Sequence, residues 1–129
     1  MSVTLTEFAL VAAGGALGAA GRFGIGRMEL FADSRWYVTA GINVAGSLLI
    51  GILWALFSYF DVSRQWYLLA ITGLLGGFTT YSAFSLDTVM LVHDGHVAES
   101  AVCAFLTLSG CLTACAAGLY VTEKLLKLI

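Results

Sequence analysis

The feature that most constrains this chain is a series of long apolar segments that contain no charged residue. The clearest runs from Tyr37 to Phe60, and three others cover residues 8–21, 66–86 and 100–122. A helix needs about 20 apolar residues to cross the hydrocarbon core of a bilayer. Only 11% of the 129 residues are charged, whereas soluble domains carry about 25% charged residues. We therefore expect an all-α membrane protein.

These segments predict one membrane domain over residues 1–129, with four transmembrane helices at about 5–27, 37–60, 66–93 and 98–123. The first segment is short, and it reaches spanning length if Arg22 extends its charged head to the interface. No basic residue precedes it, so it lacks the start of a cleaved signal peptide and is expected to be retained. The connections are short, which predicts that consecutive spans pack as antiparallel neighbours.

The basic residues give the chain no preferred orientation. With four spans, both termini and the middle loop share one side of the membrane. That side holds Arg64, Lys124 and Lys127, and the other holds Arg22, Arg27 and Arg35. Because orientation normally follows an excess of Lys and Arg on one side, we expect insertion both ways and an antiparallel homodimer about a two-fold axis in the membrane plane. The alternative is a chain oriented by some other feature.

Several function classes are not expected. The net charge is -2 and the basic residues are scattered, which argues against a nucleic-acid-binding face. Cys103, Cys111 and Cys115 lack the spacing of a metal or redox motif. His93 and His96 have no nucleophile or ligand set around them in the sequence. The chain is therefore not expected to be an enzyme.

Small residues recur at intervals of four in three of the spans. The patterns are Gly14 with Gly18, Gly73 with Gly77, and Gly110 with Ala114 and Gly118. Small residues at this spacing let membrane helices approach closely. They predict helix packing and carry no information about a transported substance.

Polar residues follow one face of the second span. Thr39, Asn43 and Ser47 are spaced four apart, so they share a helix face. The carboxamide of Asn43 is the costly group, because near the middle of a bilayer it must face protein or water. Either a hydrogen bond between helices or a polar pathway would satisfy it. The last span carries a second line at the same spacing, formed by Thr107, Cys111 and Cys115.

The third span contains the densest signal, GLLGGFTTYSAFSLDT from Gly73 to Thr88. Glycine costs a helix about 1 kcal/mol relative to alanine, so we expect this helix to be broken near its middle. Freed carbonyls at such a break can hold a small cation. The aromatic rings and hydroxyls that follow could coordinate an anion, because ring edges carry the positive part of the aromatic quadrupole. An aromatic packing cluster is the alternative.

Three motifs carry a family resemblance: GGALGAAGRF at 14–23, INVAGSLLIG at 42–51 and GGFTTYSAFS at 76–85. In this order, in a chain of this length, they resemble the small dual-topology fluoride channels of bacteria, the Fluc or CrcB family. The resemblance covers nearly the whole chain. It implies a passive fluoride-selective channel that exports fluoride, provides fluoride resistance, lies in the bacterial cytoplasmic (inner) membrane as a multi-pass protein, and has two pores per antiparallel homodimer.

The resemblance also implies roles for single residues. Tyr81 and Phe84 match two phenylalanines whose ring edges contact fluoride, and Ser82 matches an adjacent hydroxyl. Asn43 matches a pore-lining asparagine, and Arg22 matches an arginine near the aqueous vestibule. The carbonyls of Gly76 and Thr79 match the ligands of a structural sodium ion (Na+) at the dimer centre. The full set expected along the fluoride pore is Asn43, Tyr81, Ser82, Phe84, Thr39, Ser47, Cys111 and Cys115.

The chain departs from the family pattern at a few positions. Tyr81 stands where phenylalanine is usual, Ala83 replaces a frequent threonine, and Asp87 stands where glutamate is common. Cysteines 111 and 115 fall where serine or threonine is frequent, and a thiol is a weak donor. Conduction is therefore expected to be slower than in relatives with hydroxyls there.

Two other functions fit a short four-span chain. A small dual-topology multidrug transporter would need a titrating carboxylate deep in the membrane, but Glu7 and Asp87 lie towards the ends of their spans. A structural scaffold without transport would need the packing glycines only. It would leave the polar face of the second span without a purpose.

Overall fold

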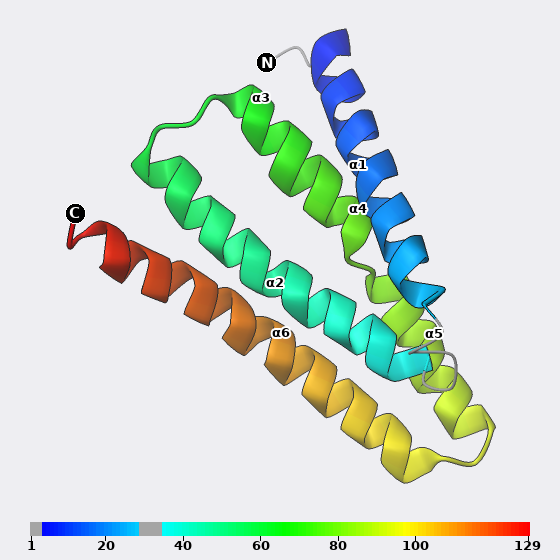
Figure 1. The fold of residues 1–129 in the computed structure, drawn as a ribbon. Coiled ribbons are helices and arrows are strands. Elements are labelled where there is room, and N and C mark those ends of the chain that lie inside the picture. Colours follow the sequence, from blue (N-terminus) through cyan, green and yellow to red (C-terminus); the bar gives the residue numbers. More distant parts are fainter. Residues whose placement is uncertain (1–3, 29–34) are drawn as a thin grey trace.

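The computed structural model describes residues 4–28 and 35–129, which form helices joined by short connections (Figure 1). The first two spans are α1 (Leu5–Gly26) and α2 (Arg35–Tyr59), and the last is α6 (Val97–Leu126). The third span consists of α3 (Arg64–Tyr67), the π-helix η2 (Leu68–Leu75), α4 (Gly76–Phe78) and α5 (Tyr81–His93). Four helical segments are long and apolar enough to cross a membrane, and the described residues contain no strand. This confirms the predicted all-α architecture with four spans.

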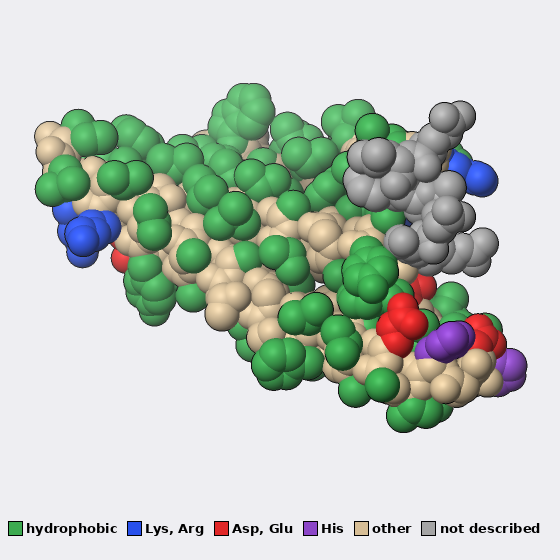
Figure 2. All heavy atoms as spheres, turned by 60° about the horizontal axis from the view of Figure 1, so that its bottom comes forward, with side chains coloured by type: hydrophobic (Ala, Val, Ile, Leu, Met, Phe, Trp, Pro, Cys, Tyr) green, Lys and Arg blue, Asp and Glu red, His purple; other side chains and the backbone are tan. Residues whose placement is uncertain are grey.

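The surface has the character of a lipid-facing protein. Figure 2 shows apolar side chains along the length of the visible face, with charged and histidine side chains near its two ends. Phe105 and Leu112 in the middle of α6 are 70% and 73% exposed. Soluble monomers rarely expose large contiguous apolar patches, so this surface is typical of a protein that faces lipid.

The side chain of Arg35, which was counted above among the basic residues that set orientation, lies outside the described residues.

The closest packing joins alternate spans, which corrects the expectation drawn from loop length. The most extensive contacts are those of α2 with α6 and of α1 with η2 and α4 (Figure 1). Gly51 of α2 lies against the backbone of Cys115 and Leu119. In both pairs the two helices run parallel, because residues further along one helix contact residues further along the other. Short loops set the direction of each span, but small residues decide which spans touch backbone to backbone.

The predicted break in the third span is confirmed, although its cause differs. Gly73, Gly76 and Gly77 are helical, and a side chain on Gly73 or Gly77 would meet the backbone of α1. The helix ends at Phe78, and Thr79 and Thr80 are extended, with ψ of 155° and 111°. Gly73 and Gly77 therefore serve packing against α1, as their spacing predicted, and the two threonines form the break.

A small buried cluster connects α2, α5 and α6 beyond the break. Trp36, Phe84 and Cys103 pack together, and each is less than a tenth exposed. The indole Nε1 of Trp36 donates to Oε1 of Glu99 at 2.7 Å, which connects the beginning of α2 to the beginning of α6. This packing fixes the position of Phe84 on the first turn of α5.

Candidate functional site

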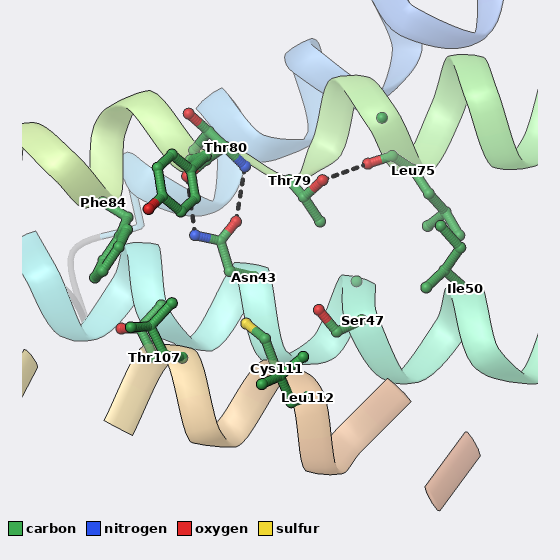
Figure 3. Close-up of a pocket in the computed structure, with 14 residues that line it drawn as sticks. Asn43, Ser47, Ile50, Leu75, Thr79, Thr80, Phe84, Thr107, Cys111 and Leu112 are labelled. Carbon is green, nitrogen blue, oxygen red and sulfur yellow. Dashed lines mark hydrogen bonds between the residues drawn. The ribbon is translucent and has the colours of Figure 1, made fainter. Parts of the chain in front are cut away.

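A pocket of about 340 Å³ lies at the helix break, between α2, the third span and α6 (Figure 3). Its polar groups are hydroxyls, one carboxamide, one thiol and peptide groups, set in an otherwise apolar wall. Such a wall with a few convergent polar groups is typical of binding sites. The residues that line it are Asn43, Gly46, Ser47, Ile50, Leu75, Gly76, Thr79, Thr80, Tyr81, Phe84, Thr107, Leu108, Cys111 and Leu112. Within the described chain, no Asp, Glu, Lys, Arg or His belongs to this lining.

The side chain of Asn43 bridges α2 and the break. Asn43 is only 7% exposed. Its Nδ2 donates to the carbonyl oxygen of Thr80 at 2.9 Å, and the N–H of Thr80 donates to its Oδ1 at 2.7 Å (Figure 3). The sequence left open whether a hydrogen bond between helices or a polar pathway satisfies this carboxamide. The structure shows the hydrogen bond, and both of its partners line the pocket.

Thr80 is a site residue that the sequence analysis missed. Its hydroxyl oxygen accepts a hydrogen bond from the N–H of Ala83 at 3.1 Å, which caps the beginning of α5. The hydroxyl also lies 3.2 Å from Oγ of Ser82. A threonine directly before a helical segment is a recognised start signal, so this capping role could have been read from the sequence.

The break redirects the hydrogen bonds of two backbone carbonyls. In a continuous helix, the N–H of Thr80 would donate to Gly76 and the N–H of Ala83 would donate to Thr79. Here the first donates to Asn43 and the second to the Thr80 hydroxyl. The carbonyls of Gly76 and Thr79 therefore lose their helical donors, and both residues line the pocket. Neutral carbonyl oxygens of this kind are suitable ligands for a hard cation, so the donor set fits the expected sodium ion.

The two aromatic residues of the third span form an edge contact. The ring centroids of Tyr81 and Phe84 lie 5.3 Å apart at an interplanar angle of 64°. Phe84 is 6% exposed and Tyr81 is 72% exposed, so one ring lies in the protein interior and the other lies at the surface. Thr107 of α6 also lines the pocket, and its buried hydroxyl has no hydrogen-bond partner among the described residues.

The pocket gathers most of the residues predicted for the site. The pore residues in its lining are Asn43, Ser47, Tyr81, Phe84 and Cys111, and the carbonyl residues in it are Gly76 and Thr79. Three of the predicted pore residues, Thr39, Ser82 and Cys115, are not part of the lining. Arg22 also lies outside it, but its Nε donates to the carbonyl of Gly77 at 3.4 Å, next to the break.

The remaining lining residues had little sequence signal. Thr107 stood at the head of the polar line on the last span but was not predicted as a site residue. Gly46 lies so close to Thr79 that a side chain on it would overlap the Thr79 methyl group. The apolar residues of the wall resemble any others in a membrane span, and only packing shows that they face the pocket.

Comparison with known proteins gives consistent matches over most of the chain. The family model described as CrcB-like protein, Camphor Resistance (CrcB), matches residues 9–119. A protein of Agrobacterium fabrum is 38% identical over 124 residues, which cover 94% of this chain and 99% of the relative. A protein of Erythrobacter litoralis is 40% identical over 125 residues, covering 88% and 89%. Both relatives are named fluoride-specific ion channel FluC.

Proposed function

This chain belongs to the CrcB-like protein family, and from that premise we propose that it is a passive, fluoride-selective channel in a lipid bilayer. The observation that carries the proposal is the likeness to relatives named fluoride-specific ion channels, which extends over nearly the full length of both chains. The uncharged pocket at the helix break supports it. The family is one of channels, so the chain has no enzymatic role.

The chemistry of the pocket suits a small, strongly hydrated anion. A channel must replace the water around its ion, but it must also release the ion readily. A lysine or arginine in the wall would hold fluoride too tightly, and no basic side chain lines the described pocket. The ring edges of Tyr81 and Phe84 provide weak positive potential instead. Ser82 and Ser47 add hydroxyl donors along the path.

The rest of the predicted path extends this pocket. Thr39 continues the polar face of α2, and Cys111 and Cys115 provide thiols along α6. Arg22 attracts fluoride towards the vestibule, since a basic group outside the narrow path raises the local anion concentration. We propose these roles from the family resemblance and from the positions of the residues around the break.

An antiparallel homodimer would complete the site. The balanced basic residues favour insertion in both orientations, and Tyr81 is 72% exposed in the single chain although it belongs to the pocket wall. A second copy that covers this face would enclose a pore on each side of the two-fold axis. We place this dimer in the bacterial cytoplasmic (inner) membrane, where export provides fluoride resistance.

A structural sodium ion fits the carbonyls of Gly76 and Thr79. Both have lost their helical donors, and both belong to the same short break. A bound sodium ion would supply positive charge to carbonyl oxygens for which hydrocarbon offers no partner. These carbonyls, taken from both copies of the chain, would hold the ion at the centre of the dimer.

The multidrug-transporter alternative is not supported. Proton-coupled export needs an acid that binds and releases protons deep in the membrane, and no carboxylate belongs to the lining of the described pocket. The relatives named above are channels for fluoride rather than transporters of organic cations.

A liposome experiment tests the proposal directly. Purified protein is reconstituted into vesicles loaded with potassium fluoride, and efflux is started with valinomycin and followed with a fluoride electrode. We expect rapid, passive release of fluoride and almost none of chloride in matched vesicles. Fluoride release no faster than in protein-free vesicles would overturn the assignment, and coupled release of organic cations would revive the alternative.

A further inference from the structure

The carboxamide of Asn43 acts on the backbone of the break rather than on a side chain. It uses its oxygen as an acceptor and one of its amide hydrogens as a donor, and both bonds go to Thr80. We infer that Asn43 is a positioning residue, which holds the third span broken and so keeps the conducting groups in place. This inference rests on the proposed fluoride conduction.

The clamp replaces bonds that a broken helix cannot make. Thr80 is extended, so its N–H no longer donates to a helical carbonyl. Its own carbonyl oxygen stands at the N-cap of α5 and accepts the Asn43 amide with its second lone pair. A peptide group without partners in hydrocarbon costs several kcal/mol. An asparagine side chain presents one donor and one acceptor in a single plane, which matches both peptide groups of Thr80. Asn43, at 7% exposure, is therefore the residue that makes the break stable at this depth.

The position of Thr80 connects the clamp to both halves of the site. On one side, the Thr80 hydroxyl caps α5, whose first turn carries Tyr81 and Phe84. On the other side, the Thr80 N–H bonds to Asn43, which leaves the Gly76 carbonyl without its helical donor. Without the clamp, that N–H can return to Gly76 and close the helix. The rings would then turn away from their present positions, and the carbonyl would no longer be available.

A positioning role and a direct ligand role predict different behaviour for aspartate. A protonated aspartic acid has one O–H donor and one carbonyl acceptor, which is enough to repeat both bonds to Thr80. It has no second hydrogen to offer to fluoride, whereas asparagine keeps one amide hydrogen that the clamp does not use. Ionised aspartate is an acceptor only and would face the Thr80 carbonyl, so the clamp would fail. Acid should therefore restore both the stability and the conduction of Asn43→Asp if the clamp is what matters. Removal of a negative charge from the anion path would by itself restore conduction without stability, and that outcome would overturn the inference.

The experiment compares fluoride efflux of the parent, Asn43→Asp and Asn43→Ala between pH 8 and pH 5. An aspartate carboxyl group has an ordinary pKa of about 3.9, so its protonated fraction rises as the pH falls through this range. Loss of this buried pair of hydrogen bonds should slow conduction about 10- to 100-fold. We expect Asn43→Asp to conduct that much more slowly than the parent at pH 8 and to gain rate relative to the parent as the pH falls to 5. Asn43→Ala should stay slow at every pH.

Background effects are removed by matched measurements. Protein-free vesicles give the leak of hydrogen fluoride, which grows in acid. The titratable and charged groups around the break are Tyr81 and Asp87 on α5, Cys111 on α6 and Arg22 on α1, and none is on the adjoining turns of α2. They are present in the parent and in both variants, so the parental pH profile contains their contribution.

A second readout keeps the inference separate from the proposed function. The thermal stability of each protein in detergent is measured over the same pH range without fluoride. Asn43→Asp should become more stable relative to the parent in acid, whereas Asn43→Ala should not. If the parent releases no fluoride, the proposed function fails, and the stability data still decide whether the clamp exists. Asn43→Asp that is equally impaired or misfolded at both pH values, or Asn43→Ala that conducts at the parental rate, would overturn the inference.

Discussion

Gly18 of α1 and Leu74 of η2 are in backbone contact, with no side chain between them. A methyl group added to Gly18 would overlap the carbonyl oxygen of Leu74 and approach the backbone nitrogen of Phe78 to 2.7 Å. One turn earlier, Gly14 approaches the Leu74 nitrogen in the same way. The first span thus packs directly on the part of the third span that precedes the break, and it supports that segment from the side opposite α2.

Replacement of Gly18 by alanine should therefore destabilise the protein. The two backbones would have to separate, and overpacking of this kind costs about 1–3 kcal/mol. The measurement is the thermal unfolding temperature in detergent, followed by size-exclusion chromatography after heating. The matched control is Gly24→Ala on the same helix, where no atom lies within 4 Å of the added group. Because alanine favours helices, the control should be as stable as the parent or more so, and equal stability of the two variants would contradict the contact.

Loss of the Phe84 ring should slow conduction without loss of the fold. Phe84→Ile keeps apolar bulk at a position that is 6% exposed but removes the positive ring edge. An edge interaction is worth about 0.5–1.5 kcal/mol, so fluoride efflux should fall about 2- to 10-fold. Tyr81→Phe keeps the edge and serves as the control, with efflux close to the parental rate. A Phe84→Ile protein that elutes and conducts like the parent would remove this ring from the pathway.

Sodium should stabilise the protein even when fluoride is absent. A cation bound to the folded state at a concentration 100 times its dissociation constant contributes about 2.7 kcal/mol. We expect a higher unfolding temperature in sodium chloride than in the chloride of a large organic cation at the same ionic strength. The effect should saturate as sodium is titrated. Equal unfolding temperatures across the titration would count against a site built from the Gly76 and Thr79 carbonyls.

The chain should insert into the membrane in both orientations. Three basic residues stand on each predicted side, so the usual determinant of orientation is balanced. A single cysteine placed in a C-terminal tag should react with an impermeant reagent on about half of the molecules in intact cells. Two added lysines after Lys127 should shift most molecules to one orientation, which provides the control. A parent protein with only one labelled orientation would exclude the antiparallel dimer.

The number and position of the spans could be predicted from the sequence, since they depend on local properties. Each span is a run of apolar residues of sufficient length, and lipid requires such a run to be helical. The polar face of α2 could also be recognised, because helical spacing alone places Asn43 and Ser47 on one face. The pocket lining contains both of these residues. The group of aromatic and hydroxyl residues after Gly77 is visible in the sequence itself.

The exact cause and consequence of the break depended on contacts between distant segments. The adjacent glycines 76 and 77 were predicted to break the third span, but both are helical, and α1 packs against the bare backbone of Gly77. The break falls instead at Thr80, where Asn43, 37 residues earlier in the chain, satisfies the exposed peptide groups. Helix propensity describes a residue among its sequence neighbours, whereas in lipid a helix can open only where another span supplies the missing hydrogen bonds. The sequence by itself therefore determined four spans and a polar third helix, and only the tertiary structure decided which peptide groups were freed and which side chain holds them.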